Sequence, residues 1–361
     1  MGATIVSYDV LKAAATLVLE RLGYPPPQAA ITAEALVEAD ARGVPSHGVA
    51  RLEFYEKNIK GGFAVAAAQP EVVHETPISL VVDGNNGVGP HVACFTMDRC
   101  IEKAAKSGAG FGAVRNSNHF GMAGLWAERA AAKDQIGMAF TNTRICSIPT
   151  FGRQRILGTN PLCFAIPQEG RPPFMVDMAT TTVAHGKIEV YERRDKDMPL
   201  GWVVDETGKG TTDTKAFQKL FWSTCPDGGH LFLGGEGEES GGHKGFGLGL
   251  LVDLLCAGLS MGAWSLHTFE VKGQGSKIAH LFGSISLGLF GDPVKIRRHV
   301  AGILDEVRGS HKAEGHDRIY IHGEKEAEAR ARSMKAGVEL DEETTHILEK
   351  YGTQFGIQLG F

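Results

Sequence analysis

The fold class is indicated by one stretch, Gly110-Phe111-Gly112-Ala113-Val114-Arg115-Asn116-Ser117-Asn118-His119-Phe120-Gly121-Met122-Ala123-Gly124. Its apolar start is typical of a buried strand, and the segment Leu125–Ala132 that follows the polar turn is typical of a helix. In α/β proteins ligands bind at the carboxyl ends of strands, which is where His119 would lie. Histidine is the commonest general acid–base near neutral pH, so His119 is the candidate catalytic residue. The alternative is a helix-capping loop in which His119 has no chemical role.

The rest of the chain alternates between strand-like and helix-like segments. Short apolar strands are predicted over 72–74, 79–83, 136–143 and 174–180, and helices over 91–106 and 183–192. This alternation favours an α/β class with a parallel or mixed sheet. The first 60 residues predict three helices, the third beginning at Ser46 and ending at Gly61-Gly62.

That third predicted helix carries a possible anion clamp. His47, Arg51 and Tyr55 are spaced i, i+4 and i+8, which places them on one face of a continuous helix. Arg51 can hold a carboxylate through two parallel hydrogen bonds. The alternative is a solvated polar face with no ligand.

Two further segments are candidates for ligand contacts. Asp177 follows an apolar strand and can orient a ribose hydroxyl or the catalytic histidine, or it simply begins a helix. The glycine-rich stretch 234–247 precedes an apolar helix, and Lys244 within it can neutralise a phosphate held at the helix start. A flexible surface loop is the competing reading of this stretch. The sequence lacks both the P-loop order and a Gly-x-Gly-x-x-Gly in its first strand–helix unit, so a doubly wound Rossmann fold is not expected.

Composition excludes several classes of protein. The chain has 361 residues, 43% of them hydrophobic, and a formal charge of −5, which argues against nucleic-acid binding. No signal peptide is apparent, and the apolar run 247–263 predicts a buried core helix rather than a membrane span. Six cysteines without a Cys-x-x-Cys pair indicate free thiols in a reducing, cytoplasmic environment. No metal-ligand spacing is present, so no metal site is expected.

Six ordered motifs resemble the malate/L-lactate dehydrogenase family of the non-Rossmann type, over about residues 7–352. The motifs are Ser46-His47-Gly48-Val49-Ala50-Arg51, Asn116-Ser117-Asn118-His119-Phe120-Gly121, Leu157-Gly158-Thr159-Asn160-Pro161, Asp177-Met178-Ala179-Thr180, Gly241-Gly242-His243-Lys244-Gly245 and Gly323-Glu324-Lys325-Glu326. The resemblance implies a mixed-sheet NAD(P)-binding domain over 71–291 beside a helical domain built from 1–70 and 292–361. It also implies a homodimer.

The resemblance also implies a role for each matched residue. His119 corresponds to the proton donor and acceptor, and His47 and Arg51, with Tyr55 on the same stripe, to the substrate site. The implied cofactor-binding residues are Thr141, Asp177, Met178, Ala179, Lys244, Gly323 and Glu324. Arg144 falls where family members vary, and it either meets the second carboxylate of a substrate or faces solvent. The glycine-rich loop is longer than the family pattern before Lys244.

The activity implied is reversible hydride transfer between NAD or NADP and a 2-oxo acid/2-hydroxy acid pair, with malate and oxaloacetate favoured. The alternatives are lactate, sulfolactate or ureidoglycolate dehydrogenases and a cyclic imino acid reductase. A relative that binds nucleotide without catalysis is a further alternative, disfavoured because His47, Arg51, His119 and Lys244 are all present.

Overall fold

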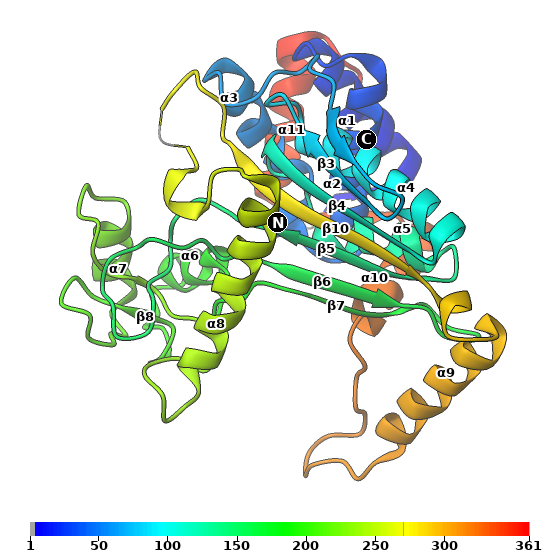
Figure 1. Ribbon diagram of the computed structural model, residues 1–361. Coiled ribbons are helices and arrows are strands. Elements are labelled where there is room, and N and C mark those ends of the chain that lie inside the picture. The colour runs from blue at the N-terminus through cyan, green and yellow to red at the C-terminus, as the bar shows by residue number, and fades with distance from the viewer. Residues whose placement is uncertain (1–3, 270, 361) are drawn as a thin grey trace.

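The fold is organised around a central mixed sheet. The computed structural model describes residues 4–269 and 271–360, and Figure 1 shows the sheet crossing the middle of the molecule. Its strands, in spatial order, are β2 (Glu71–Glu75), β3 (Ser79–Asp83), β4 (Ala109–Ser117), β10 (Ile278–Ser286), β5 (Gln135–Thr141), β6 (Leu162–Ile166) and β7 (Phe174–Met178). Only the β3–β4 pair of this sheet is parallel, and every other neighbouring pair is antiparallel. This mixed order confirms the expected fold class and excludes a doubly wound parallel sheet.

Helices cover both faces of this sheet. One face packs against α4 (Gly89–Ser107) and α5 (Ala123–Ala131), whose buried side chains share a core with β3, β4, β6 and β10. The other face packs against α8 (Gly242–Asp253) and the π-helical turn Leu254–Gly258 that continues it. The sheet is therefore the middle layer, and the polar ends of its strands are free to contribute to a site.

Both ends of the chain share a second core. Buried side chains of α1 (Tyr8–Arg21), α2 (Pro26–Ala41) and α3 (Leu52–Lys60) pack with those of α11 (Glu342–Phe355). The short strand β1 (Thr4–Val6) pairs with β11 (Val338–Leu340), which joins the start of the chain to the segment that precedes α11. These helices lie against α4 through α2, next to the sheet.

Two regions project from this body in Figure 1. One holds α6 (His185–Arg193), α7 (Thr214–Phe221) and the paired strands β8 (Val203–Val204) and β9 (Gly229–His230). The other is α9 (Pro293–Gly309), none of whose residues is buried, followed by a long connection to α10 (Glu324–Ala336).

Two sequence predictions are wrong. The expected helix from Ser46 is split into short 3₁₀ turns at Pro45–His47 and Val49–Arg51, and α3 begins only at Leu52. The run 247–263 is not a buried core helix, because several of its large apolar side chains are exposed: Leu248, Leu250, Leu251, Leu254, Leu259 and Met261. The other face of the run packs on the sheet, so one face is buried and the opposite face is exposed.

Candidate functional site

A buried carboxylate, that of Asp40, holds the turn that carries His47. Asp40, on α2, accepts a hydrogen bond from the backbone N–H of Val49 at 2.7 Å. Gly48, in an extended conformation, lies so close to this carboxylate that any β-carbon there would clash with it. This packing explains why the predicted helix is interrupted, since Gly48 leaves the helical conformation to let Asp40 cap the turn.

His119 lies at the end of β4, where three other side chains surround its ring. Tyr55 Oη is 3.1 Å from His119 Nδ1, and the backbone N–H of Gly121 also points to Nδ1 at 3.3 Å. The His47 ring stacks on it, with centroids 5.4 Å apart, and Phe54 meets it edge-on. Of the described residues, none hydrogen-bonds to Nε2, so this atom is the one available to a ligand.

Both histidines of this stack are neutral at pH 7. Burial, with the Arg51 charge nearby, lowers the pKa of His47 to about 4. Burial, with the Arg51 charge nearby, holds the pKa of His119 well below its usual value of 6.5. An anionic ligand beside these rings would raise both values again, because it stabilises the imidazolium form.

Arg51 supplies the nearby permanent positive charge. Its Nε donates to the backbone oxygen of Ser46 at 2.6 Å, and the side chain is exposed. Its guanidinium carbon lies 5.9 Å from the centre of the Phe54 ring, which also touches His119. The structure thus brings His47, Arg51, Tyr55 and His119 together, although the first three do not share one continuous helix.

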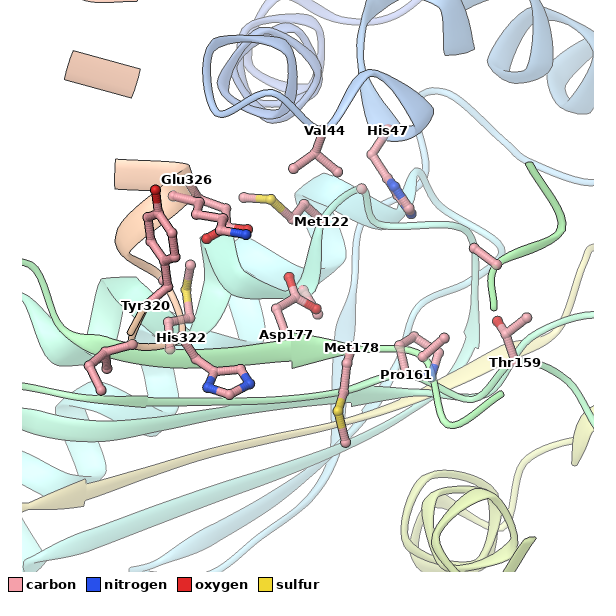
Figure 2. A pocket seen from close by; sticks show the side chains of 18 residues that line it. Val44, His47, Met122, Thr159, Pro161, Asp177, Met178, Tyr320, His322 and Glu326 are labelled. Atoms are coloured by element: carbon pink, nitrogen blue, oxygen red, sulfur yellow. The ribbon is translucent and has the colours of Figure 1, made fainter. Parts of the chain in front are cut away.

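A cavity of about 470 Å³ opens beside this cluster, between the helices at the chain ends and the edge of the sheet (Figure 2). In Figure 2, Val44 and His47 lie on one side of it, and Asp177 and Met178 on the other. The lining also includes the start of α5 at Gly121–Ala123. Four sequence-predicted cofactor residues line it: Asp177, Met178, Ala179 and Gly323.

Asp177 is held against the first turn of α5. Its Oδ2 accepts from the backbone N–H of Gly124 at 2.6 Å. Gly124 has no room for a side chain, since a β-carbon would lie 2.9 Å from that same oxygen and 2.8 Å from Met175 Sδ. Burial, with Glu326 nearby, raises the pKa of Asp177 to about 6 despite this hydrogen bond.

Seven predicted residues are not among the described residues that line the cavity. His119, Arg51 and Tyr55 belong to the cluster beside it, and Thr141, Arg144, Lys244 and Glu324 lie elsewhere. Arg144 and Lys244 are exposed, whereas Thr141 is buried and hydrogen-bonds to His280. Glu324 receives hydrogen bonds from Arg308, Arg318 and the backbone of Ile321, which makes it an anchor for the segment before α10.

The residues whose hydrogen bonds position the walls of the cavity were not predicted from the sequence. Asp253 accepts from the amides of Asn142 and Asn160 and from Ser265 Oγ, and all four side chains are buried. This network fixes the segment 159–161, and Thr159 and Pro161 line the cavity. Asp253 was visible in the sequence as a single charge inside an apolar run, which is a signal of a buried polar network.

Tyr320 and His322 also line the cavity and were not selected from the sequence, whereas Glu326, which lines it too, belongs to the motif Gly323-Glu324-Lys325-Glu326. They lie beside Gly323 in a charged stretch that gave no periodic signal. Among the described residues there is no group of three or more His, Cys, Asp or Glu that could hold a metal ion. No helix in the described ranges is long and apolar enough to cross a membrane.

Comparison with known proteins fits this geometry. Malate dehydrogenase of Pyrococcus abyssi is 38% identical over 342 residues, which are 94% of this chain and 92% of that protein. L-sulfolactate dehydrogenase of Methanocaldococcus jannaschii is 34% identical over 345 residues, covering 95% of this chain and 94% of the relative. The crystal structure of malate dehydrogenase from Entamoeba histolytica superposes with a TM-score of 0.95 at 34% identity, covering 99% of this chain and all of that one. Residues 6–349 match the malate/L-lactate dehydrogenase family, and the chain belongs to it.

Proposed function

We propose that this protein catalyses reversible hydride transfer between a nicotinamide cofactor, NAD or NADP, and a 2-oxo acid/2-hydroxy acid pair. Malate and oxaloacetate are the favoured pair. The observation that carries the proposal is the stack of His119 and His47 beside Arg51, at the mouth of a cavity that His47 itself lines. A cation, a proton carrier and an apolar cavity are the elements that such a reaction requires.

The cavity fits one half of a dinucleotide. Its volume lies within the range of ~300–1,000 Å³ that small-molecule sites occupy, and its walls are mainly apolar with a few polar groups. Gly121 and Gly323 bring backbone to its surface with positive φ angles of 82° and 91°. Asp177 would accept a hydrogen bond from a ribose hydroxyl, and Met178 and Ala179 would contact the adjoining ring.

Proton transfer is assigned to His119 Nε2. Tyr55 and Gly121 engage Nδ1, which leaves Nε2 facing the substrate oxygen. In the oxidative direction neutral His119, with its own proton on Nδ1 and donated to Tyr55 Oη, takes the proton of the substrate hydroxyl on Nε2. In the reductive direction the doubly protonated ring returns the Nε2 proton to the carbonyl oxygen. The bound cofactor accepts or supplies the hydride. Because the pKa of His119 is low in the free protein, the substrate carboxylate and its charge must raise it before His119 can act as an acid.

Substrate orientation is assigned to Arg51 and His47. Arg51 would grip the substrate carboxylate, and His47, neutral at pH 7, would donate a hydrogen bond to it. Fixing the carboxylate sets the position of the adjacent carbonyl carbon, and positioning of this kind can contribute substantially to the rate of an oriented reaction.

Malate is favoured because two of the three relatives compared above are named malate dehydrogenases. Exposed Arg144 is available to a second carboxylate if the segment 143–146 closes over the substrate. Sulfolactate, which carries a sulfonate in the same place, is the second candidate, since one relative is named for it. Arg144 serves either anion.

A panel of 2-oxo acids tests the proposal, with oxaloacetate, pyruvate, sulfopyruvate and a cyclic imine each offered with NADH and with NADPH. Oxidation of the cofactor is followed by absorbance. Turnover of oxaloacetate that exceeds that of pyruvate by tenfold or more in kcat/KM, or about 1.4 kcal/mol, is expected. The proposal is contradicted if the protein oxidises neither NADH nor NADPH with any of the four compounds.

We also propose that the protein is a homodimer. The exposed side chains of α8 and the turn after it include Leu248, Leu251 and Leu254, and α9 exposes Val294, Ile303 and Val307 while ion pairs tie it to Asp134 and Glu169. Exposed apolar surface of this extent is typical of interfaces. Sedimentation should give a dimer, and Leu254→Glu should shift it toward the monomer; a wild-type monomer contradicts the assignment.

The same proposal extends to the division of the chain and its location. The core that α1, α2 and α3 share with β11 and α11 supports a helical domain over 1–70 and 292–361 beside a cofactor-binding domain over 71–291, although α9 and α10 contribute no side chain to that core. The six free cysteines fit a cytoplasmic protein.

A further inference from the structure

His280 occupies the centre of the sheet, directly beneath the loop that carries His119. It lies on β10, between β4 and β5, and its side chain is fully buried. A buried imidazole inside an apolar strand must find partners for both ring nitrogens, because an unpaired buried polar group destabilises the fold. Its two partners come from the two neighbouring strands.

Each ring nitrogen reaches one of these strands. Nε2 lies 2.8 Å from Ser117 Oγ, on the last residue of β4. Nδ1 lies 2.8 Å from Thr141 Oγ1, on the last residue of β5. One side chain therefore joins the strand that leads to His119 to the strand that leads to the predicted cofactor contact.

The pairing of β4 with β10 is irregular at this point. Ile278 pairs with Ser117, but His280 pairs with Val114, so β4 carries an extra residue. Asn116 absorbs it with a φ of 53°, a left-handed conformation. Such a bulge redirects the side chains that follow it, and the sheet hydrogen bonds alone do not fix their new direction.

A second set of contacts pins the loop beyond the bulge. The Phe120 ring stacks on His280 with centroids 4.6 Å apart and planes 4° from parallel. Ser276, two residues before the start of β10, donates a hydrogen bond from its hydroxyl to the backbone oxygen of Ser117 at 2.9 Å. His280 on β10 therefore contacts Ser117 before His119 and Phe120 after it, whereas the His119 ring contacts Tyr55.

The role of His280 is geometric. Burial lowers its pKa to about 3, so it stays neutral wherever the enzyme works. Both nitrogens are already occupied, and it touches no residue of the substrate clamp.

We propose that His280 is a positioning residue, which sets the direction of His119 through Ser117 and Phe120 and ties that direction to the end of β5 through Thr141. This inference rests on the proposed function, because His119 is taken there as the proton carrier. It adds a residue that makes no contact with substrate and acts through the catalytic loop.

Two amide variants separate the two arms. The amide of His280→Gln reaches the Nε2 position and can keep the bond to Ser117, whereas the amide of His280→Asn reaches the Nδ1 position and can keep the bond to Thr141. An amide offers either a donor or an acceptor, so the exchange works for both tautomers of the native ring. Ser117→Ala removes the first arm while His280 stays intact.

A positioning role predicts different kinetics for the two amides. His280→Asn and Ser117→Ala should each lower kcat about tenfold or more, since misplacement by about 1 Å can cost up to 10²-fold. KM for the 2-oxo acid should change little, and His280→Gln should keep kcat within about threefold of wild type. Adding Ser117→Ala to His280→Asn should lower kcat no further, because both changes remove the same hydrogen bond between His280 and Ser117. Equal losses in the two amide variants, or additive losses in the double variant, overturn the proposal.

A substrate-free readout keeps this test separate from the proposed function. Carbethoxylation of His119, followed by peptide mass spectrometry, should change in rate for His280→Asn and Ser117→Ala but not for His280→Gln. Identical rates in all four proteins overturn the positioning role, even if the wild type reduces 2-oxo acids. A wild type that reduces none of them overturns the proposed function alone, and Ser117→Ala keeps the comparison available if either His280 variant fails to fold.

Discussion

Two polar, glycine-containing turns precede helices in this chain, and they differ in what holds them. The loop 115–121 before α5 is fixed by residues far away in sequence, among them Asp83, Tyr55 and Ser276. The loop 234–241 before α8 is held by its own backbone, such as Gly241 N–H to Glu238 O and Ser240 Oγ to Glu236 O. The first loop presents a fixed histidine, whereas the second leads into α8, whose first turn carries the exposed Lys244.

Two glycines at the start of α8 explain part of this difference. A β-carbon on Gly242 or Gly245 would clash with the backbone of Gly235 or Leu233, so these glycines allow the loop to pack against the start of the helix. The sequence pattern suggested that they approach a phosphate. The structure gives them a packing role, and Lys244 is left free in solvent. The comparison predicts that chemistry depends on the first loop, and cofactor affinity at most on the second.

The largest effect is expected at His119. His119→Gln should lower kcat by about 10²–10⁴-fold, the range for loss of a general acid–base. Cofactor affinity, measured by nicotinamide fluorescence, should stay within about threefold, because the proposed cofactor contacts are untouched. His74→Gln, on exposed β2, is the matched control. Near-normal turnover of His119→Gln at saturating substrate removes this residue from the mechanism.

Arg51→Ala should come next. Loss of a charge-assisted contact worth ~1.5–3 kcal/mol should raise KM for the 2-oxo acid about 10–100-fold. It should also move the acid limb of the kcat/KM profile for 2-hydroxy acid oxidation to higher pH. Arg51 lowers the pKa of His119, and the base must be unprotonated, so removing the charge lets His119 protonate earlier as pH falls. Lys57→Ala, an exposed charge on α3, is the control; an unchanged KM and an unmoved limb in Arg51→Ala rule out the clamp.

Tyr55→Phe tests how the ring of His119 is oriented. Removal of the hydroxyl 3.1 Å from Nδ1 should lower kcat by about 3–10-fold, as expected for one hydrogen bond worth ~1 kcal/mol. Tyr24→Phe makes the same chemical change in the helical core, where among the described residues the Tyr24 hydroxyl has no partner. Equal kcat values for Tyr55→Phe, Tyr24→Phe and wild type indicate that the ring is held by stacking alone.

The smallest effect is expected at Lys244, which follows the second loop. Lys244→Ala should weaken cofactor binding by a few-fold and less so at high salt, because an exposed charge contributes ~1 kcal/mol or less. Its kcat at saturating cofactor should equal that of wild type. Lys219→Ala, exposed on α7, is the control for charge loss. If Lys244→Ala lowered kcat as much as His119→Gln does, the proposed difference in function between the two loops would be wrong.

Much of the site was predictable, for identifiable reasons. His119, Asp177 and the strands before them follow from apolar runs that end in polar residues, and this signal is local. The anchors were not predictable in the same way. Asp40 contacts Val49, and His280 contacts Ser117, only in the folded chain, so no local pattern marks these pairs. Asp253 stands out as a single charge inside an apolar run, but its partners Asn142 and Asn160 do not.

The helix boundaries failed where such anchors act. The expected helix from Ser46 is interrupted because buried Asp40 takes the N–H of Val49. The prediction that the run 247–263 is buried fails because hydropathy does not show which face of an apolar helix packs on the sheet and which face stays exposed. Both errors are tertiary effects that override local propensity.

The central claim is that His119, His47 and Arg51 act on one substrate beside the cavity. A crystal structure with reduced cofactor and oxalate, an unreactive 2-oxo acid analogue, tests it most directly. The account predicts one oxalate carboxylate on the Arg51 guanidinium and an oxygen within ~3.2 Å of His119 Nε2. It also predicts the nicotinamide between that oxygen and Asp177. Oxalate bound away from His119, or cofactor bound outside the cavity lined by Asp177 and Gly323, would contradict it.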